Sequence, residues 1–235
     1  NVADKDREAD EFSVSAALFA RKFGKVAGQA VIKASRQFSS AFREFPFHIE
    51  VLYHAPQNFG PANLLYWQPT GYRATMIGFP YDDLEGWRGN YPPDIFAAQF
   101  RKLAEGWQAG VRTLLDSRST VDEPYCEAYD EMIRIASAAG AHFQSAANQI
   151  EFVICRDQWL ASESEAAQHR AKSRLLELVD DEIRVTRELL AHVRADSRIG
   201  FEASNHYYYS ERELLEKVLN CLEIRDRLTG TKDDL

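Results

Sequence analysis

The stretch DIFAAQFRKLAEGWQAGVRTLL, residues 94–115, decides the fold class. Its large apolar residues recur at intervals of one, three or four positions, and most of the residues between them are polar or small. Those residues are Ile95, Phe96, Phe100, Leu103, Trp107, Val111 and Leu114. This spacing puts them on one face of an α-helix. We therefore predict a long amphipathic helix that buries this face.

The same periodicity recurs on both sides of this stretch. Further helices are predicted at Glu8–Phe23, Gln29–Arg43, Pro124–Leu160, Glu165–Ala195 and 211–228. Thr120–Glu123, Ser162–Glu165 and Ser210–Glu213 have the Ser/Thr-x-x-Glu spacing of a capping box, which marks helix N-termini. The prediction is a single all-α domain over residues 1–235, an antiparallel bundle of about six long helices. Residues 24–28 contain two glycines and form either a turn or a kink.

Residues 45–93 differ in kind from the rest of the chain. They hold seven of the eight prolines and eleven of the 28 aromatic residues. Prolines at this frequency exclude a long helix, and the aromatic content argues against disorder. His48–Tyr53, Asn63–Trp67 and Tyr72–Gly78 are predicted as short strands or extended runs. A long ordered insertion in a compact domain is often functional, so we expect function here.

Charge and composition narrow the classes of partner. The net charge is −8 and the sequence pI is about 5.3. An acidic chain argues against nucleic acid and against an anionic membrane as the main partner. The three cysteines, Cys126, Cys155 and Cys221, are odd in number and far apart, so we expect free thiols. Together with the lack of an apolar signal region, they favour a soluble, cytoplasmic protein.

The chain begins at Asn1 rather than at methionine. We expect it to be the C-terminal part of a longer multidomain protein, the alternative being a native protein trimmed by a few residues.

Common catalytic motifs are absent from the sequence. No Glu-x-x-His pair suggests a carboxylate-bridged metal site, and there is neither a GxSxG elbow nor a P-loop. We expect no metal and no cofactor.

Two loops combine aromatic rings with polar groups. Residues 78–88 place carboxylates among Phe, Tyr and Trp, and residues 200–209 place an acid, an amide and a histidine beside three tyrosines. Such pockets suit a sugar, whose C–H face stacks on a ring while its hydroxyls bond to polar groups. The alternative is that these aromatic residues pack the end of the bundle or contact a neighbouring domain. The candidate ligand-binding residues are Trp67, Tyr72, Tyr81, Asp82, Asp83, Trp87, Arg88, Glu202, Asn205, His206 and Tyr207.

Three runs carry a resemblance to a known group of proteins. They are SSAFREFPFH at 39–48, GPANLL at 60–65 and DSRIGFE at 196–202. The chain resembles the helical C-terminal region of large bacterial proteins related to glycoside hydrolases, in which a catalytic (β/α)8 barrel lies upstream. The resemblance implies that the catalytic acid and base belong to that barrel and that the aromatic loops cover it or line a substrate cleft.

Three functions therefore remain open. The first is an accessory helical domain of a carbohydrate-active enzyme, whose partners are the upstream catalytic domain and carbohydrate. The second is a helical protein–protein interaction module with an exposed aromatic surface. The third is a free-standing helical enzyme with a site around Glu202 and His206.

Overall fold

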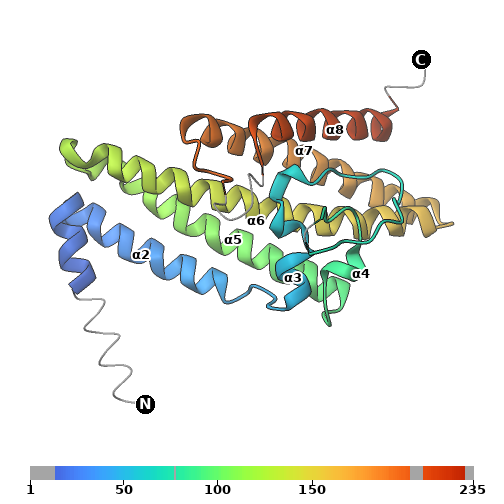
Figure 1. The fold of residues 1–235 in the computed structure, drawn as a ribbon, viewed down its shortest axis with the longest axis horizontal. Coiled ribbons are helices and arrows are strands. Elements are labelled where there is room, and N and C mark those ends of the chain that lie inside the picture. The colour runs from blue at the N-terminus through green and yellow to red at the C-terminus, as the bar shows by residue number, and fades with distance from the viewer. Residues whose placement is uncertain (1–13, 77, 202–208, 231–235) are drawn as a thin grey trace, which may run out of the picture. The chain divides into compact units, whose positions relative to one another are not determined.

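The chain is predominantly helical in the computed structural model, which describes residues 14–76, 78–201 and 209–230 (Figure 1). After a first helix that includes residues 14–23, the long helices are α2 (Lys25–Phe42), α5 (Pro93–Ser117), α6 (Cys126–Ala161), α7 (Glu165–Ala195) and α8 (Glu211–Thr229). The described ranges contain no strand. The all-α prediction is confirmed, and the largest boundary error is at α2, which begins four residues before Gln29.

Gly24 makes the turn that joins the first helix to α2. Its φ of +86° lies in the left-handed region, which glycine adopts without steric cost. One turn later, Gly28 lets the two helices approach closely. A Cβ at Gly28 would lie 2.5 Å from the backbone nitrogen of Ala20. The two glycines at residues 24–28 thus form a turn followed by a helix contact.

Gly28→Leu is expected to destabilise this helix pair by about 1–3 kcal/mol, because the new side chain meets backbone atoms that cannot rotate away. Gln29→Leu is the matched control, since it introduces the same side chain at the next, exposed position. Thermal unfolding followed by circular dichroism measures the difference. Equal melting temperatures for the two variants would contradict the close contact.

The chain divides into two compact units. Unit 1 comprises residues 1–44 and 102–140, and unit 2 comprises residues 45–101 and 141–235, so that α5 and α6 contribute to both. The core of unit 1 brings together α2, α5 and α6 through Phe23, Ala27, Val31, Ala34, Val111, Leu114, Val121, Tyr129 and Ala136. Gly140 of α6 faces Trp107 and Gln108 of α5, where an added Cβ would lie 2.8 Å from the Gln108 amide nitrogen.

Unit 2 has a core of its own, built mainly by α6, α7 and α8. Its buried members are Leu65, Phe152, Leu175, Leu178, Val179, Ile183, Cys221, Ile224 and Leu228. Eight of these nine residues lie on α6, α7 or α8. Leu65 is different because it comes from the proline-rich insertion, which therefore contributes to the core.

Only one of the three predicted capping boxes forms. Ser210 and Glu213 cap α8 reciprocally, as predicted. The prediction is wrong at Thr120–Glu123, because the Thr120 hydroxyl donates to the carbonyl of Ser117 and short 3-10 turns precede α6. It is also wrong at Ser162, because α7 starts after Ser164 and the Ser162 hydroxyl accepts from the backbone of Ser164.

The insertion contains short helical pieces instead of strands. They are α3 (Ile49–Tyr53), the 3-10 turns η1 (Pro56–Asn58) and η2 (Gly60–Ala62), and α4 (Leu84–Trp87). The strand prediction for His48–Tyr53 is wrong, since His48 caps α3 by accepting from the Glu50 N–H at 3.3 Å. The described parts of Asn63–Trp67 and Tyr72–Gly78 are irregular.

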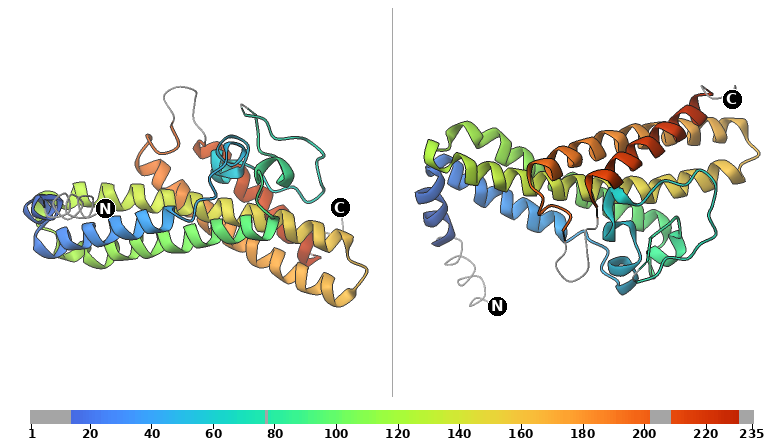
Figure 2. Two further views of the ribbon diagram at one scale, coloured as in Figure 1. Left: turned by 90° about the horizontal axis from the view of Figure 1, so that it is seen from below. Right: turned by 45° about the horizontal axis from the view of Figure 1, so that its top comes forward.

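At Leu65, a side chain takes the place of a neighbouring strand. The amide of Asn220, on α8, accepts from the Leu65 N–H and donates to the Leu65 carbonyl, each at 2.9 Å. This pair of bonds satisfies the backbone of Leu65 as a neighbouring strand would. Figures 1 and 2 show the insertion beside α8 from three directions.

Candidate functional site

The insertion is fastened to the helices of unit 2 by buried polar side chains. Asn63 is the central residue: its amide donates to the Tyr81 carbonyl at 2.8 Å and to the Gln149 side chain at 2.9 Å. Gln149, on α6, in turn donates to the carbonyl of Gly60 at 2.8 Å. Lys217, on α8, donates to the Asn63 carbonyl. Two helices therefore hold the same short segment of the insertion.

Lys217 also forms a fully buried ion pair with Glu182 of α7. Their charged groups are 3.2 Å apart, and neither side chain is exposed to solvent. Glu182 accepts from Ser145 at 2.5 Å and from Asn148 at 3.1 Å. Buried charges require both a partner and hydrogen bonds, and here both charges have them. The pair thus links α6, α7 and α8 to the backbone of the insertion.

A second buried ion pair anchors the middle of the insertion. Arg156, on α6, lies 2.6 Å from Asp82 and donates to the Tyr66 carbonyl at 2.8 Å. Asp82 also accepts from the backbone and the hydroxyl of Thr70. Both charged side chains are almost completely buried. Asp82, predicted as a ligand-binding residue, thus joins two parts of the insertion to α6.

Asp83 organises the turn that leads into α4. Its carboxylate accepts from the Arg73 guanidinium at 2.8 Å, from the Ala74 N–H at 2.9 Å and, as the N-cap of α4, from the Gly86 N–H at 3.3 Å. Three donors converge on one buried carboxylate, so Asp83 ties residues 73–74 to residues 83–86. Its observed contacts are internal to the insertion.

Three other predicted residues also make internal contacts. Trp87 is completely buried and donates from its indole N–H to the Pro80 carbonyl at 2.8 Å. Arg88 pairs with Glu85 at 2.5 Å and donates to the Tyr91 carbonyl at 2.7 Å. Trp67 packs on Trp159 of α6, with ring centroids 4.9 Å apart. Their contacts shape the insertion and attach it to the bundle.

Two of the predicted aromatic residues, Tyr72 and Tyr81, lie together with Phe59 and Phe79. Ring centroids are 5.2 Å apart for Phe59 and Phe79, 6.1 Å for Phe79 and Tyr81, and 5.2 Å for Tyr72 and Tyr81. We call these four residues the aromatic surface; Met76 lies in the same segment of the chain, three positions before Phe79. Tyr72 is 65% exposed, Met76 58% and Phe79 51%. Large apolar side chains gathered in this way mark a binding surface more often than scattered ones do.

The backbone beneath the aromatic surface is held in an unusual conformation. Tyr81 has a φ of +53°, the only positive value at a non-glycine residue among those described. Such a conformation persists where surrounding contacts over-determine it. Here the Tyr81 carbonyl is bonded to Asn63 and the next residue, Asp82, is paired with Arg156. The buried anchors therefore set the position of the exposed rings.

The space behind the aromatic surface does not form a ligand cavity. The gap lined by Asn63, Tyr66, Tyr81, Asp82, Trp87 and Gln149 has no room even for a water molecule. Burial, together with the nearby Tyr81 and Asp82, raises the pKa of the Tyr66 hydroxyl. A ligand at this place would have to bind on the outside, against the exposed rings.

Most of the second predicted loop, residues 200–209, lies outside the described residues. Glu202, Asn205, His206 and Tyr207 are among these residues, so their ligand-binding role stays a prediction.

Within the ranges that are described, no three His, Cys, Asp or Glu side chains are grouped to hold a metal ion. None of the helices in those ranges is long and apolar enough to cross a membrane.

The cysteines are free thiols, as predicted. Cys221 is buried in the core of unit 2, and this burial raises the pKa of its thiol to about 12. Only the thiolate is nucleophilic, and with this pKa about one part in 10⁴ of the Cys221 thiol is thiolate at pH 8, so alkylation is slow. Iodoacetamide is therefore expected to leave Cys221 unmodified in the folded protein and to label it on unfolding in urea. Peptide mass spectrometry measures the labelling, and rapid labelling without urea would contradict the buried position.

Comparison with known proteins gives this chain no relative. No protein-family model matches it, and no curated protein or solved structure is significantly similar. The resemblance to the C-terminal region of glycoside-hydrolase-related proteins therefore stays a prediction.

The residues that hold the insertion were not predicted, although the sequence contains a signal for them. Asn148, Gln149 and Arg156 interrupt the apolar face of α6, and Lys217 lies between Leu214 and Val218 on α8. A polar residue on a buried helix face needs a partner. Those partners lie far along the chain, so the signal identifies the residues but not their contacts.

Proposed function

We propose that this chain is a helical protein-interaction module that binds a partner through its aromatic surface. The observation that carries the proposal is the exposure of Tyr72, Met76 and Phe79 on a segment that buried ion pairs hold in place. A rigid surface binds with a smaller loss of conformational entropy than a flexible loop does. Aromatic residues, Met and Arg are also the types enriched in the centres of protein interfaces.

The polar groups nearby favour a protein over a glycan as the partner. A sugar site needs fixed polar groups that point outward beside an exposed ring. Asp82 and Asp83, the carboxylates closest in sequence to Tyr81, have nearly buried side chains and accept from internal donors. The side chain of Arg73 is largely exposed and supplies a polar rim.

The accessory-domain hypothesis is one form of this proposal. In that form the partner is the catalytic domain of a carbohydrate-active enzyme, and the aromatic surface packs on it. Direct contact with carbohydrate is the competing hypothesis, and it predicts binding of free oligosaccharides at the same rings.

The test compares two pairs of substitutions in the full-length protein, produced in its native cells. Tyr72→Asp with Phe79→Asp changes the aromatic surface, and Ile95→Asp with Leu219→Asp changes two exposed apolar residues elsewhere in unit 2. Native electrophoresis measures the fraction of the protein that migrates as a complex. We expect the first pair to lower this fraction at least about tenfold, because residues at the centre of an interface carry most of the binding energy. The second pair lies outside the aromatic surface and is expected to change the fraction less than about twofold.

Saturation-transfer NMR with a panel of oligosaccharides distinguishes the competing hypothesis. Transfer to an oligosaccharide that Tyr72→Asp abolishes would contradict a protein partner and favour carbohydrate binding. Equal loss of the complex in both pairs of variants would also contradict the proposal, because the aromatic surface would then have no special role.

A further inference from the structure

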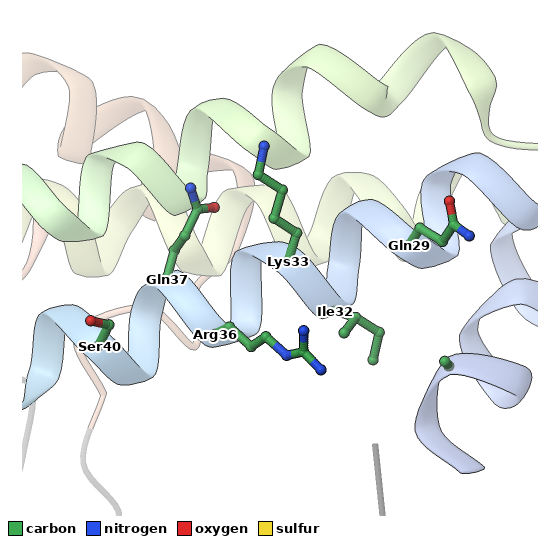
Figure 3. Close-up of a pocket in the computed structure, with 7 residues that line it drawn as sticks. Gln29, Ile32, Lys33, Arg36, Gln37 and Ser40 are labelled. Carbon is green, nitrogen blue, oxygen red and sulfur yellow. The ribbon is translucent and has the colours of Figure 1, made fainter. Parts of the chain in front are cut away.

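A groove of about 440 Å³ lies on unit 1, lined by Ala16 of the first helix and by a face of α2 that includes Ile32 and Arg36 (Figure 3). Nothing in the structure shows what fills this groove. The aromatic surface of unit 2, in contrast, contains a backbone conformation that costs free energy, at Tyr81. Such conformations gather at functional sites, where the contacts around them sustain them.

The left-handed backbone at Tyr81 is unfavourable for a tyrosine. Its φ is +53°, and in this region the Cβ atom of an L-residue comes too close to the following carbonyl oxygen. Glycine has no Cβ atom and adopts the same conformation without this steric cost. A tyrosine at this position therefore makes the turn less stable than a glycine would.

Backbone contacts on both sides hold the turn at residues 80–82. The Pro80 carbonyl accepts from the Trp87 indole N–H at 2.8 Å. The Tyr81 carbonyl accepts from the Asn63 amide, also at 2.8 Å, and the Asp82 carboxylate forms the buried ion pair with α6. None of these bonds uses the Tyr81 side chain. They would hold a glycine equally well, so they account for the turn but not for the tyrosine.

The ring of Tyr81 connects the exposed rings of the aromatic surface. Its centroid lies 5.2 Å from that of Tyr72 and 6.1 Å from that of Phe79. These two side chains are 65% and 51% exposed, whereas Tyr81 is only partly exposed. On its other side, the Tyr81 ring lies 6.4 Å from the ring of Tyr66. Tyr81 is therefore the member of the aromatic surface against which its most exposed rings pack.

We propose that Tyr81 is the positioning residue of the aromatic surface, and that its strained backbone is retained for partner binding at a cost in stability. This inference rests on the function proposed above. The Tyr81 ring supports Tyr72 and Phe79 and limits the orientations that they sample before binding. Rings that are ordered beforehand lose less conformational entropy in the complex. A role in stability alone would favour glycine at this turn, because natural proteins keep strain where function requires it.

Three substitutions separate the ring of Tyr81 from its backbone. Tyr81→Phe keeps the ring and the strain, Tyr81→Ala keeps only the strain, and Tyr81→Gly removes both. Native electrophoresis of the full-length protein from its native cells measures the fraction that migrates as a complex. We expect Tyr81→Ala and Tyr81→Gly to lower this fraction at least about fivefold, and Tyr81→Phe to change it less than about twofold. Tyr53→Ala is the control, because it removes a 43% exposed ring elsewhere in the insertion, and is expected to change the fraction less than about twofold.

Thermal unfolding of the same variants measures the strain. Tyr81→Gly and Tyr81→Ala lack the same ring contacts, so the difference between their melting temperatures reports the backbone conformation. We expect Tyr81→Gly to melt about 2–4 °C above Tyr81→Ala. The more stable of these two variants would then still fail to form the complex, a combination that a purely structural role of Tyr81 does not produce.

Three results would overturn the inference and leave the proposed function intact. The first is a complex that forms normally with Tyr81→Gly although Tyr72→Asp with Phe79→Asp abolishes it. The second is a loss of the complex in Tyr81→Phe as large as in Tyr81→Ala, and the third is an equal melting temperature for Tyr81→Gly and Tyr81→Ala. A complex that Tyr72→Asp with Phe79→Asp leaves unchanged would instead contradict the proposed function, and the inference about Tyr81 would fail with it.

Discussion

Lys217→Met is expected to lower the free energy of unfolding of unit 2 by about 3–5 kcal/mol, because it leaves the buried Glu182 carboxylate without its positive partner. The two side chains are completely buried and 3.2 Å apart. The substitution also removes the donor to the Asn63 carbonyl, which fastens the insertion to α8. Methionine fills much of the volume of lysine, so the lower free energy of unfolding reports the missing charge rather than a large cavity.

The measurement is urea unfolding followed by alkylation of Cys221, a probe that lies in unit 2. Arg212→Met is the matched control, since it removes an exposed cation from the same helix and is expected to change stability by less than about 0.5 kcal/mol. Adding Glu182→Gln to Lys217→Met removes the unpaired charge and is expected to restore part of the loss. Equal unfolding curves for Lys217→Met and Arg212→Met would contradict the ion pair.

Arg156→Leu is also expected to lower the free energy of unfolding of unit 2 by about 3–5 kcal/mol. It leaves the buried Asp82 carboxylate with Thr70 as its remaining donor and releases the Tyr66 carbonyl. Both contacts attach the insertion to α6. We therefore expect residues 66–82 to open locally more often than in the unchanged protein, besides the loss in global stability.

Limited digestion with trypsin measures this local opening, because Arg73 lies in the affected segment and its side chain is largely exposed. We expect cleavage after Arg73 to accelerate at least about tenfold in Arg156→Leu, in proportion to the population of the open form. Arg174→Leu is the control. Arg174 on α7 forms a partly exposed ion pair with Glu151, so this substitution is expected to lower the free energy of unfolding by about 1 kcal/mol or less. An unchanged rate of cleavage after Arg73 would show that Arg156 does not hold the insertion.

The long helices could be predicted because their apolar residues recur at helical spacing. Phe96, Phe100 and Leu103 of α5 are completely buried, as their positions on the predicted stripe require. Leucine, valine and phenylalanine need only an apolar environment, which any neighbouring helix supplies. Local spacing is therefore enough to recognise such helices without knowing their partners.

The insertion could not be predicted in the same way, because its structure depends on specific partners far along the chain. Asn220 takes the place of a strand beside Leu65, although 155 positions separate the two residues. Asp82 and Asp83 were chosen as ligand-binding candidates because they are carboxylates among aromatic residues. Their donors, Arg156 and Arg73, show that the same residue types also suit a structural anchor.

Site-specific photocrosslinking shows directly whether the aromatic surface contacts a protein partner. A photoreactive phenylalanine analogue replaces Phe79 in the full-length protein, and the same analogue at the exposed Leu219 is the control. Illumination in native cells, followed by mass spectrometry, identifies the crosslinked peptide. We expect a single abundant protein adduct from position 79 that Tyr72→Asp removes and that position 219 does not form. Adducts of equal yield and composition from both positions would contradict it.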